Sequence, residues 1–586
     1  MIPLTALLAL GPRFFRGVSC GHDFDFHLVS WMETQRSWQQ GVLYPHWAQS
    51  PNWGAGEARF VFYPPLTWML GAALGYLISW DWVPAALTFL FLAGAGLTTR
   101  AFAGQFLPAR NATLAGVLAT ATPYGLFTAY ERTAFSELAA AAWIPLLLLF
   151  ALRRRETRAA SQLRQAFDGS AAPLALVFGA IWLTNAPAGV MASYLLAFVA
   201  LVAAIVERAW WPPLRAAVAA ILGLGIAAIY IVPAALEQRW IAINEAIDVG
   251  MRVSDSWLFA HHNSPDLQLH DRVLHTASTI LVVMAAATLA TLALCLIGPK
   301  LTRESRRYWL PLALLVPILV CLQFSISAPL WNNLPKLQFL QFPWRWLMVL
   351  GTPYAAFAAA ATPLTTHRAK WLSASCWCVV LLVCVIGASR SFFLPCDDED
   401  APAPQAAVFH AGTGVEGTDE YASLNSDNSL VATGLPEGCL VSDSTKTLAD
   451  PNPNGLDSPP AWTPALHTCD ETYQPQIWHN EYKLLEIHPQ HAGFVILRLR
   501  RYPAWRITVN GKPLSNLTTA SADQREDGLI AVPVAAGSET IEVRWRPLPD
   551  TAYGYWVSIA ALVLLIPLWL FERRTKALTI ARNLSA

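Results

Sequence analysis

Residues 277–297 read ASTILVVMAAATLATLALCLI, twenty-one residues without one charged side chain. About 20 apolar residues are needed for a helix to cross the hydrocarbon core of a bilayer. Similar runs recur along the 586-residue chain, which is 54% hydrophobic and only 14% charged. A soluble domain carries about 25% charged residues. The composition therefore predicts an integral membrane protein that crosses the bilayer many times.

Further apolar runs of span length are predicted on both sides of this one. With the segments of the front end included, we expect an α-helical polytopic protein with about 12–14 membrane segments. The other predicted spans lie near residues 83–100, 113–130, 133–152, 173–188, 189–207, 216–235, 310–326, 346–363, 372–389 and 554–571.

Clusters of arginine and lysine predict which loops face the cytoplasm, because cytoplasmic loops carry an excess of these residues. Such clusters occur within 153–164, within 300–307 and within 573–582. If all three are cytoplasmic, so is the C-terminus of a multi-pass plasma-membrane protein. The segments placed outside, or in the periplasm of a cell with two membranes, are then 236–276, 327–345 and 391–553. The 40 basic and 40 acidic residues balance, so no nucleic-acid partner is expected.

The front of the chain does not fit this alternation. If Arg100 and Arg110 are cytoplasmic, the segment 62–80 cannot be a simple span that follows an external loop at 11–61. It is then re-entrant, unless one basic position breaks the rule. The first apolar run, Ile2–Leu10, is too short to cross and lacks the charged start and cleavage site of a signal peptide. A truncated or misassigned start codon is our preferred explanation.

Region 391–553 reads as a separate external domain between a membrane module at 1–390 and a last span with its cytoplasmic tail at 554–586. Asn510-Gly511 lies between two apolar runs and is a strong signal for a tight hairpin. Several short strands at this spacing predict a small β-sandwich. The predicted strands are Phe494–Leu499, Trp505–Val509, Ile530–Val534 and Thr540–Trp545, and a loop is predicted at 447–464.

Three cysteines, Cys396, Cys439 and Cys469, fall in this external region, where disulfides are permitted. They cannot all pair with one another, and the sequence does not choose among the possible bridges. Five others lie in apolar spans and are expected to be inert packing residues: Cys295, Cys321, Cys376, Cys378 and Cys384.

Polar and aromatic residues crowd the first external loop, although the segments around it are apolar. Within it lie His22, Asp23, Asp25 and His27. A carboxylate at the membrane surface can act as a general base, and paired carboxylates can hold a divalent cation. The alternative is a solvated loop in which Asp23 or Asp25 caps the following helix. Because ionisable groups beside a bilayer are costly and tend to be functional, we favour the functional interpretation.

Other candidate residues are predicted to lie near this loop. Tyr63 either offers a flat wall for a sugar ring or lipid chain, or anchors the loop at the interface. Arg132, near Glu137 at the outer ends of two predicted spans, either binds a phosphate in bidentate fashion or pairs with a glutamate. Arg345, with Lys336, either clamps a lipid phosphate or snorkels to headgroups.

No Walker phosphate loop occurs in the sequence. No nucleotide cofactor is therefore expected, and an activated group must arrive with the substrate. A divalent cation stays open as a cofactor.

The order of these pieces resembles bacterial membrane proteins of the GT-C glycosyltransferase superfamily, in particular the group known as 6-pyruvoyl-tetrahydropterin synthase-related or YfhO-like. Nothing here resembles a soluble pterin synthase with its zinc-binding histidines. The matching pieces cover nearly the whole chain: Gly21-His22-Asp23 with His27, Gly41–Pro45 with Trp47, Phe62–Leu66, Tyr130-Glu131-Arg132 with Glu137, Leu340–Arg345, Gly417–Tyr421 and Tyr502–Trp505.

The resemblance implies transfer of a sugar from a polyprenyl-phosphate donor to an envelope glycan, lipid or protein on the outer face. GT-C enzymes occur with and without a metal, so a cation held by Asp23 and Asp25 stays open. The implied roles are Asp23 and Glu137 as catalytic acids, Arg132 and Arg345 for the donor phosphate, and His22, His27 and Tyr63 for other substrate contacts.

Two other functions stay open. A transporter or flippase of lipid-linked intermediates needs polar residues inside the spans, but the spans carry few and the acids gather at one face. A non-catalytic envelope assembly protein would work through the 391–553 domain.

Overall fold

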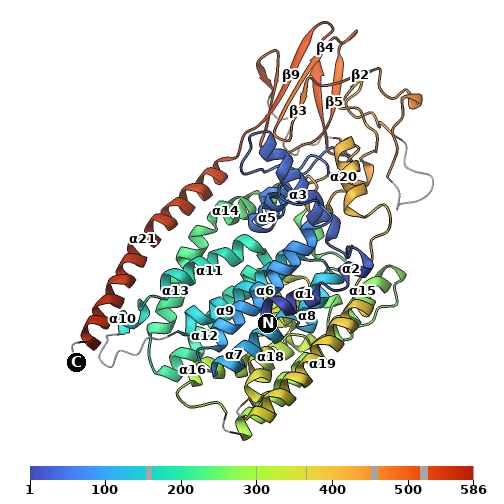
Figure 1. Cartoon of the computed structure of the whole chain (residues 1–586). Helices are drawn as coiled ribbons and strands as arrows, with labels where there is room; N and C mark the ends of the chain where they lie inside the picture. The colour runs from blue at the N-terminus through green and yellow to red at the C-terminus, as the bar shows by residue number, and fades with distance from the viewer. Residues whose placement is uncertain (154–161, 299, 365, 450–458, 515–524, 585–586) are drawn as a thin grey trace.

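The computed structural model describes residues 1–153, 162–298, 300–364, 366–449, 459–514 and 525–584. The chain forms a bundle of helices that carries a β domain near its C-terminus (Figure 1). Two predictions lie largely outside the described residues. They are most of the basic cluster within 153–164 and the middle of the loop predicted at 447–464.

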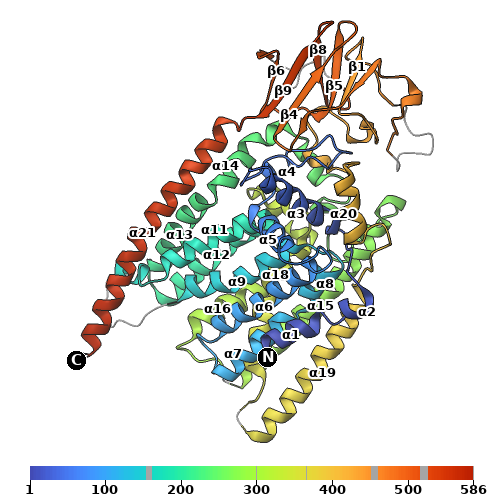
Figure 2. The same ribbon diagram turned by 45° about the horizontal axis from the view of Figure 1, so that its top comes forward.

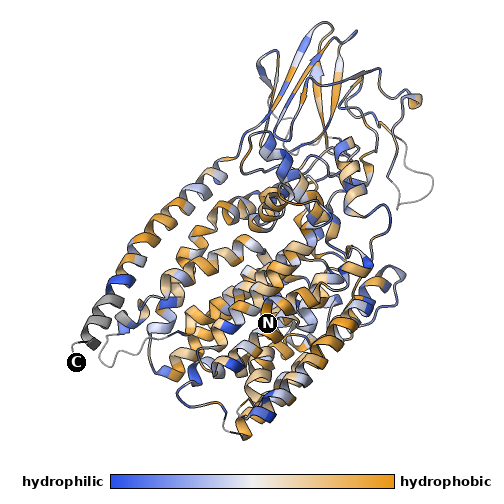
Figure 3. Ribbon diagram, viewed as in Figure 1, coloured by the Kyte–Doolittle hydropathy of each residue, from blue (hydrophilic) through white to orange (hydrophobic). Residues whose placement is uncertain are grey.

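Long apolar helices dominate the bundle. Among the described residues, six are long and apolar enough to cross a membrane, or up to eight if each of two bent pairs is one span. Their apolar residues cover most of the bundle (Figure 3). This confirms the predicted multi-pass membrane protein. The six are α6 (Val83–Ala103), α9 (Phe135–Leu152), α12 (Ala186–Glu207), α15 (Gln268–Ile297), α19 (His367–Ser391) and α21 (Pro549–Leu584), and the bent pairs are α13 (Trp211–Ile226) with α14 (Ala228–Glu237) and α16 (Arg306–Cys321) with α17 (Ala328–Asn333).

The remaining predicted spans fall on shorter helices. The run 113–130 is divided before Pro123, and Thr122 caps the second half by accepting the backbone N–H of Gly125 at 3.0 Å. The helix within 62–80 has 11 residues, so it is about 16 Å long and cannot cross a core of about 30 Å alone. The shorter helices are α5 (Pro65–Gly75), α7 (Ala109–Thr120), α8 (Pro123–Tyr130), α11 (Ala171–Thr184) and α18 (Leu347–Ala361).

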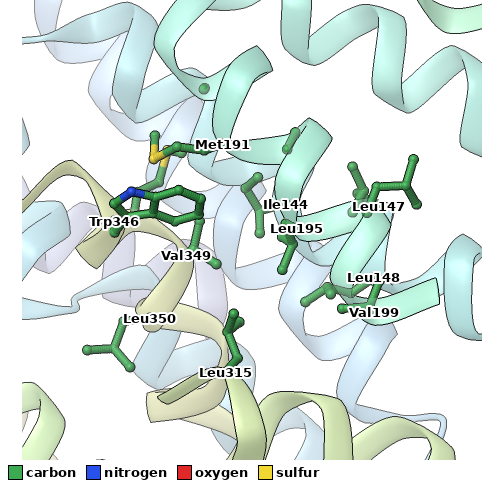
Figure 4. Packing of buried hydrophobic residues seen from close by; sticks show 14 of the residues in the cluster. Ile144, Leu147, Leu148, Met191, Leu195, Val199, Leu315, Trp346, Val349 and Leu350 are labelled. Carbon is green, nitrogen blue, oxygen red and sulfur yellow. The ribbon is translucent and has the colours of Figure 1, made fainter. Parts of the chain in front are cut away.

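Leucine, isoleucine and valine at helical spacing build the core of the bundle. Ile144, Leu147 and Leu148 lie on one face of α9 because their separations are three and four residues. They pack toward Leu195 and Val199, which lie one turn apart on α12 (Figure 4). This packing holds α9, whose first turn carries Glu137.

The end of the bundle away from the β domain is tied together by buried polar contacts. Arg215 of α13 pairs with Asp168 at 2.8 Å, and its Nε donates to the Ala166 carbonyl at 2.9 Å. Glu572 of α21 accepts the backbone N–H of Ala171 at 2.8 Å. Two regions that carry predicted cytoplasmic clusters therefore meet at one end (Figure 1).

The β domain contains two antiparallel sheets. The predicted strands are confirmed within one or two residues, and Asn510 and Gly511 both have positive φ, as a type I′ hairpin turn requires. One sheet has the order β2 (Glu471–Tyr473), β1 (Gly438–Val441), β5 (Gly493–Arg500), β8 (Leu529–Val534). The other has the order β3 (Ile477–Trp478), β4 (Tyr482–Ile487), β9 (Glu539–Trp545), β6 (Trp505–Val509), β7 (Lys512–Leu514).

Apolar packing joins this domain to the first loop. Trp47, Val61 and Phe62 lie in the same buried cluster as Trp505 and Trp545 of the domain. The ring centroids of Trp47 and Trp505 are 5.1 Å apart in an edge arrangement. Such aromatic pairs contribute about 0.5–1.5 kcal/mol beyond their buried area. The loop and the domain therefore share one core, beside α3 (Phe24–Gln39) and α4 (Arg59–Phe62) (Figure 2).

Two disulfides resolve the pairing that the sequence left open. Cys439 bonds Cys469 within the β domain, and Cys396 bonds Cys20 of the first loop. Cys20 was not among the cysteines predicted to form a bridge. The second bridge joins residues 376 positions apart and lies three residues before Asp23.

Replacement of both Cys20 and Cys396 by serine is expected to lower the free energy of unfolding by about 2–5 kcal/mol, because the bridge closes a very long loop in the unfolded chain. Thermal unfolding in detergent measures the effect. Cys321→Ser is the control, since Cys321 is free and exposed. Equal melting temperatures for the double variant and the unchanged protein would contradict this expectation.

A buried carboxylate lies at the same seam between loop and domain. Glu57 accepts from Arg59 Nε at 2.6 Å and from the backbone N–H of Thr418 at 3.0 Å. Glu420 lies two residues further on. Burial raises the pKa of the Glu420 carboxyl to about 7, and the nearby charge of Glu57 acts in the same direction.

Glu420→Gln is expected to remove a pH dependence of stability. The Glu420 carboxyl has a pKa of about 7 when folded and an ordinary value of 4.5, so the folded state binds more protons between these values. The free energy of unfolding therefore falls as pH rises through this window. We expect the variant to be more stable at pH 8 by on the order of 2 kcal/mol. Thermal unfolding from pH 4 to pH 8 measures this, with exposed Glu416→Gln as control; the same fall in both variants would refute it.

Candidate functional site

Backbone contacts hold the start of α3 against the turn between α8 and α9. The His22 N–H donates to the Glu131 carbonyl at 3.3 Å, and the Asp23 N–H donates to the Arg132 carbonyl at 2.9 Å. A Cβ at Gly21 would lie 2.3 Å from the Glu131 carbonyl oxygen, so only glycine permits this approach. The predicted acid Asp23 and the predicted cation Arg132 are therefore fixed as neighbours.

The arginines and acids predicted from separate segments form one cluster. Arg132 Nη2 lies 3.6 Å from Asp23 Oδ2, and Arg132 Nη1 donates to Glu137 Oε2 at 2.5 Å. The Tyr124 hydroxyl donates to Glu137 Oε1 at 2.5 Å. Arg345 Nε lies 3.5 Å from Glu137 Oε2. Glu137 thus contacts both arginines and the Tyr124 hydroxyl. These contacts suit a residue that holds the arginines in position.

Positive charge exceeds negative charge in the buried part of this cluster. Arg132 and Glu137 are buried and Arg345 is largely so, with side chains 4–11% exposed, whereas the Asp23 side chain is 42% exposed. Two guanidinium groups therefore share one buried carboxylate. Arg345 Nε is buried and has no hydrogen-bond partner among the described residues. The two arginines near Asp23 are positively charged, and Arg345 Nε is a donor without a partner among the described residues. This part of the site can therefore bind an anion.

This arrangement shifts the pKa values of the two arginines in opposite directions. Burial alone would lower the pKa of Arg132, but the charges of Glu137 and Asp23 outweigh it and raise the pKa above the ordinary value. Burial and the repulsion from Arg132 lower the pKa of Arg345, against the attraction of Glu137. Of the two arginines, Arg345 therefore has the positive charge that nearby carboxylates balance less.

His27 and Tyr63 lie beneath Asp23. His27 is fully buried, and burial lowers the pKa of its imidazole to about 4, so the ring is neutral at physiological pH. Its ring packs edge-on against Phe135 at 5.3 Å and against Tyr63 at 6.0 Å. The Tyr63 hydroxyl is hydrogen-bonded to Ser136 Oγ at 2.6 Å. These contacts make His27 and Tyr63 a support for the helix that carries Asp23.

His22 and Asp25 are both exposed. The pKa of His22 is lowered by partial desolvation, although Asp23 opposes the shift. Partial desolvation at the loop raises the pKa of Asp25 to about 6, and the Asp400 carboxylate adds to the effect. In the part of the chain that the structure describes, no three His, Cys, Asp or Glu side chains are grouped to hold a metal. A cation at Asp23 and Asp25 stays a prediction.

A small cavity of about 40 Å³ reaches Glu137 from the bundle interior. One water needs about 10–15 Å³. The hydroxyl of Thr128, one of its lining residues, is buried without a hydrogen-bond partner in the described chain. The polar lining residues are Thr99, Thr122, Tyr124, Thr128, Glu137 and Thr352. The cavity beside Glu137 therefore has room for water and several polar side chains that could bind it.

Polar residues inside the apolar helices also contact the cluster, and the sequence did not lead us to predict them. Tyr124 bonds Glu137, and Asn185 Nδ2 donates to Ser136 Oγ at 3.2 Å. Asn185 also caps α12 by accepting the Ala188 N–H. A hydroxyl or amide beside proline within an apolar run was the available signal, as in Thr122-Pro123-Tyr124 and Asn185-Ala186-Pro187.

The sequence contains the glycine motifs GxSxG and GxGxxG, but neither lies in the strand–turn–helix structure in which such motifs are functional. Gly17–Gly21 spells GxSxG, but Ser19 Oγ is buried and donates to the Tyr130 carbonyl at 2.8 Å. Gly412–Gly417 spells GxGxxG, but it follows helix α20 (Pro402–Ala411) instead of a strand and packs against Trp53 and Asn52. Neither segment has the strand–turn–helix context that its motif requires.

No family model matches the chain, and no curated protein matches it by sequence. Solved structures that are similar to it include the following three. The apo oligosaccharyltransferase of Archaeoglobus fulgidus has a TM-score of 0.38 and 13% identity, over 68% of this chain and 56% of that one. The same archaeal enzyme, AglB, in complex with an inhibitory peptide and a dolichol-phosphate, has a TM-score of 0.36 and 12% identity, over 72% and 56%. ArnT from Cupriavidus metallidurans, bound to undecaprenyl phosphate, has a TM-score of 0.29 and 12% identity, over 75% and 92%.

This chain spans just over half the length of the archaeal enzyme. The fold and the site define a multi-pass membrane protein with a C-terminal β domain and a buried arginine–carboxylate cluster beneath an exposed aspartate. The narrower assignment to the YfhO-like group stays a prediction.

Proposed function

We propose that the protein is a GT-C-type glycosyltransferase that moves a sugar from a polyprenyl-phosphate donor to an envelope acceptor. One observation carries the proposal. Two buried guanidinium groups share a single buried carboxylate directly beneath the exposed Asp23. An anionic phosphate would bind at Arg345, whose Nε has no hydrogen-bond partner among the described residues, and the Asp23 carboxylate faces the acceptor. The sugar class and the superfamily come from the resemblance of the ordered motifs.

The reaction is a direct displacement at the anomeric carbon. Asp23 takes the proton of an acceptor hydroxyl or amine as the new bond to the sugar forms. The bond from the sugar to the phosphate oxygen breaks, and its electron pair leaves with the polyprenyl phosphate. Arg132 and Arg345 stabilise the negative charge that develops on this leaving group. Glu137 holds both arginines in place and is a positioning residue in this scheme.

We place the site on the outer face of the membrane. Cys20–Cys396 and Cys439–Cys469 support this, because disulfides persist in oxidising compartments and are rare in the cytosol. The basic clusters at the other end of the bundle support the same orientation. The β domain then lies outside, beside the acceptor side of Asp23.

Donor turnover tests the proposal. Purified protein in nanodiscs is incubated with a panel of polyprenyl-phosphate sugars, and release of polyprenyl phosphate is followed, since slow donor hydrolysis needs no known acceptor. Nucleotide sugars serve as the matched negative donors, and an EDTA arm decides whether a divalent cation is needed. We expect turnover of at least one lipid-linked donor and of no nucleotide sugar. Folded protein that neither binds nor turns over any lipid-linked donor would overturn the proposal.

A further inference from the structure

A second pocket lies between the end of α3 and the β domain, away from Asp23. Its volume is about 270 Å³. α3 has 16 residues and begins directly after Asp23, so its far end is about 24 Å from that acid. The pocket is lined by Gln40, Val42, His479, Glu481, Tyr482, Arg544, Trp545 and Arg546. It is therefore separate from the proposed catalytic site.

Two arginines and a histidine line the pocket. Arg544 and Arg546 are both exposed. Arg544 Nε donates to Glu542 Oε1 at 2.6 Å, whereas no carboxylate pairs with Arg546 among the described residues. Glu481 is the one acid among the described residues of the lining. Its Oε1 already accepts the backbone N–H of His46 at 2.7 Å and faces His46 Nδ1 at 3.2 Å. His479 adds an exposed imidazole. The pocket therefore presents donors for an anion, with its one carboxylate already engaged.

The walls of the pocket are held rigidly. Asn480 donates its backbone N–H to Gln40 Oε1 at 2.9 Å and its side-chain amide to buried Glu33 at 2.6 Å. Trp545 stacks on His46 at 5.9 Å, and the Arg544 guanidinium lies 4.8 Å from the Tyr482 ring centroid. The basic side chains therefore project from a preformed frame, which lowers the entropic cost of binding.

The pocket lies where the β domain joins the last apolar helix. Arg546 is three residues before Pro549, the first residue of the membrane helix α21. The first turns of α21 expose aromatic side chains, Tyr553, Tyr555 and Trp556, as expected of residues at headgroup level. Leu43, next to Val42 of the lining, is 78% exposed. Exposed apolar and aromatic side chains therefore lie next to a pocket that contains arginines. A ligand with an anionic head and an apolar tail matches both surfaces.

We propose that this pocket binds the phosphate headgroup of an anionic membrane phospholipid. Arg544 and Arg546 contact the phosphate, and the acyl chains lie along the exposed start of α21. The inference does not rest on the proposed sugar transfer. Bound lipid would join α3, β4 and β9 at the membrane surface and so fix the height of the β domain above the bilayer.

Lipid binding by the full-length protein in a neutral detergent tests the proposal. Dissociation constants are measured for phosphatidylglycerol, for zwitterionic phosphatidylcholine and for soluble glycerol phosphate. The test variant is Arg544→Gln/Arg546→Gln, and the matched control is Arg506→Gln/Lys512→Gln, which removes two exposed cations from the same sheet outside the pocket lining. We expect the phosphatidylglycerol dissociation constant to rise about tenfold or more in the test variant and to change little in the control.

A second measurement needs no variant. A photoactivatable phosphatidylglycerol is crosslinked to the unchanged protein, and we expect adducts on the peptides around Tyr482 and Trp545. Equal affinity of the test variant and the control, or adducts only elsewhere, would overturn the proposal. Glycerol phosphate that binds as tightly as phosphatidylglycerol, with the same dependence on the arginines, would also overturn it by identifying a soluble phosphate as the ligand.

Discussion

Protein carrying Asp23→Asn is expected to release polyprenyl phosphate from its sugar donor at least about 100-fold more slowly than the unchanged protein. Asparagine keeps the size and the backbone contacts of Asp23 but cannot accept a proton. Loss of a positioned general base typically costs a factor of 10² to 10⁴ in rate. The rate is measured under single-turnover conditions in nanodiscs, and donor affinity is measured separately. Because the arginines stay in place, donor binding is expected to persist.

Asp25→Asn is the matched control for this variant. Asp25 lies two residues further along and is exposed, but no contact joins it to Arg132 among the described residues. If Asp23 acts as the base without a cation, replacement of Asp25 is expected to change turnover far less than replacement of Asp23. Full activity in Asp23→Asn, or an equal loss in both variants, would remove Asp23 from its proposed role as base.

Glu137→Gln is expected to lower the free energy of unfolding by about 3–5 kcal/mol, because it leaves two buried guanidinium groups without their shared carboxylate. The amide also cannot accept charge-assisted bonds from both Arg132 and the Tyr124 hydroxyl. The change is measured by reversible denaturation in mixed micelles, or as a fall in melting temperature. Donor turnover should fall with it, since Arg132 loses the contact that positions it.

A double variant tests whether the loss of stability comes from the unbalanced charge or from the altered shape of the side chain. Glu137→Gln/Arg345→Gln removes one buried cation together with the carboxylate, so we expect it to recover part of the lost stability. Glu131→Gln is the control, because Glu131 is adjacent to Arg132 but forms no ion pair with it among the described residues. A double variant less stable than Glu137→Gln would show that the cluster is not held by charge balance.

The membrane helices could be predicted because span length depends only on local apolar composition. The strands of the β domain followed from alternation and from Asn510-Gly511, whose positive φ values the turn requires. Asp23, Arg132, Glu137 and Arg345 were predicted as candidates because charged groups beside apolar spans are rare. The structure brings them together in one cluster, and their chemical roles remain proposals.

The sequence did not reveal what depends on long-range packing. Nothing local marks Cys20 as the partner of Cys396, because the bridge is made by two segments that meet only in the folded chain. Glu137 reads as a second acid in sequence, whereas its three contacts with Tyr124, Arg132 and Arg345 favour an anchoring role. The cationic pocket escaped notice because its residues come from three separated segments.

The Cys20–Cys396 bond also sets an order of events during synthesis. The loop with Asp23 leaves the ribosome early, but its partner cysteine follows 376 residues later. At about 5–20 residues per second, this delay lasts roughly 20 to 75 s. During this time most of the spans enter the membrane while the Cys20 thiol stays free or is protected in another disulfide. The loop can be locked beside the β domain only after the chain has passed through nearly all of the bundle, so maturation of the site comes late and requires an oxidant on that side of the membrane.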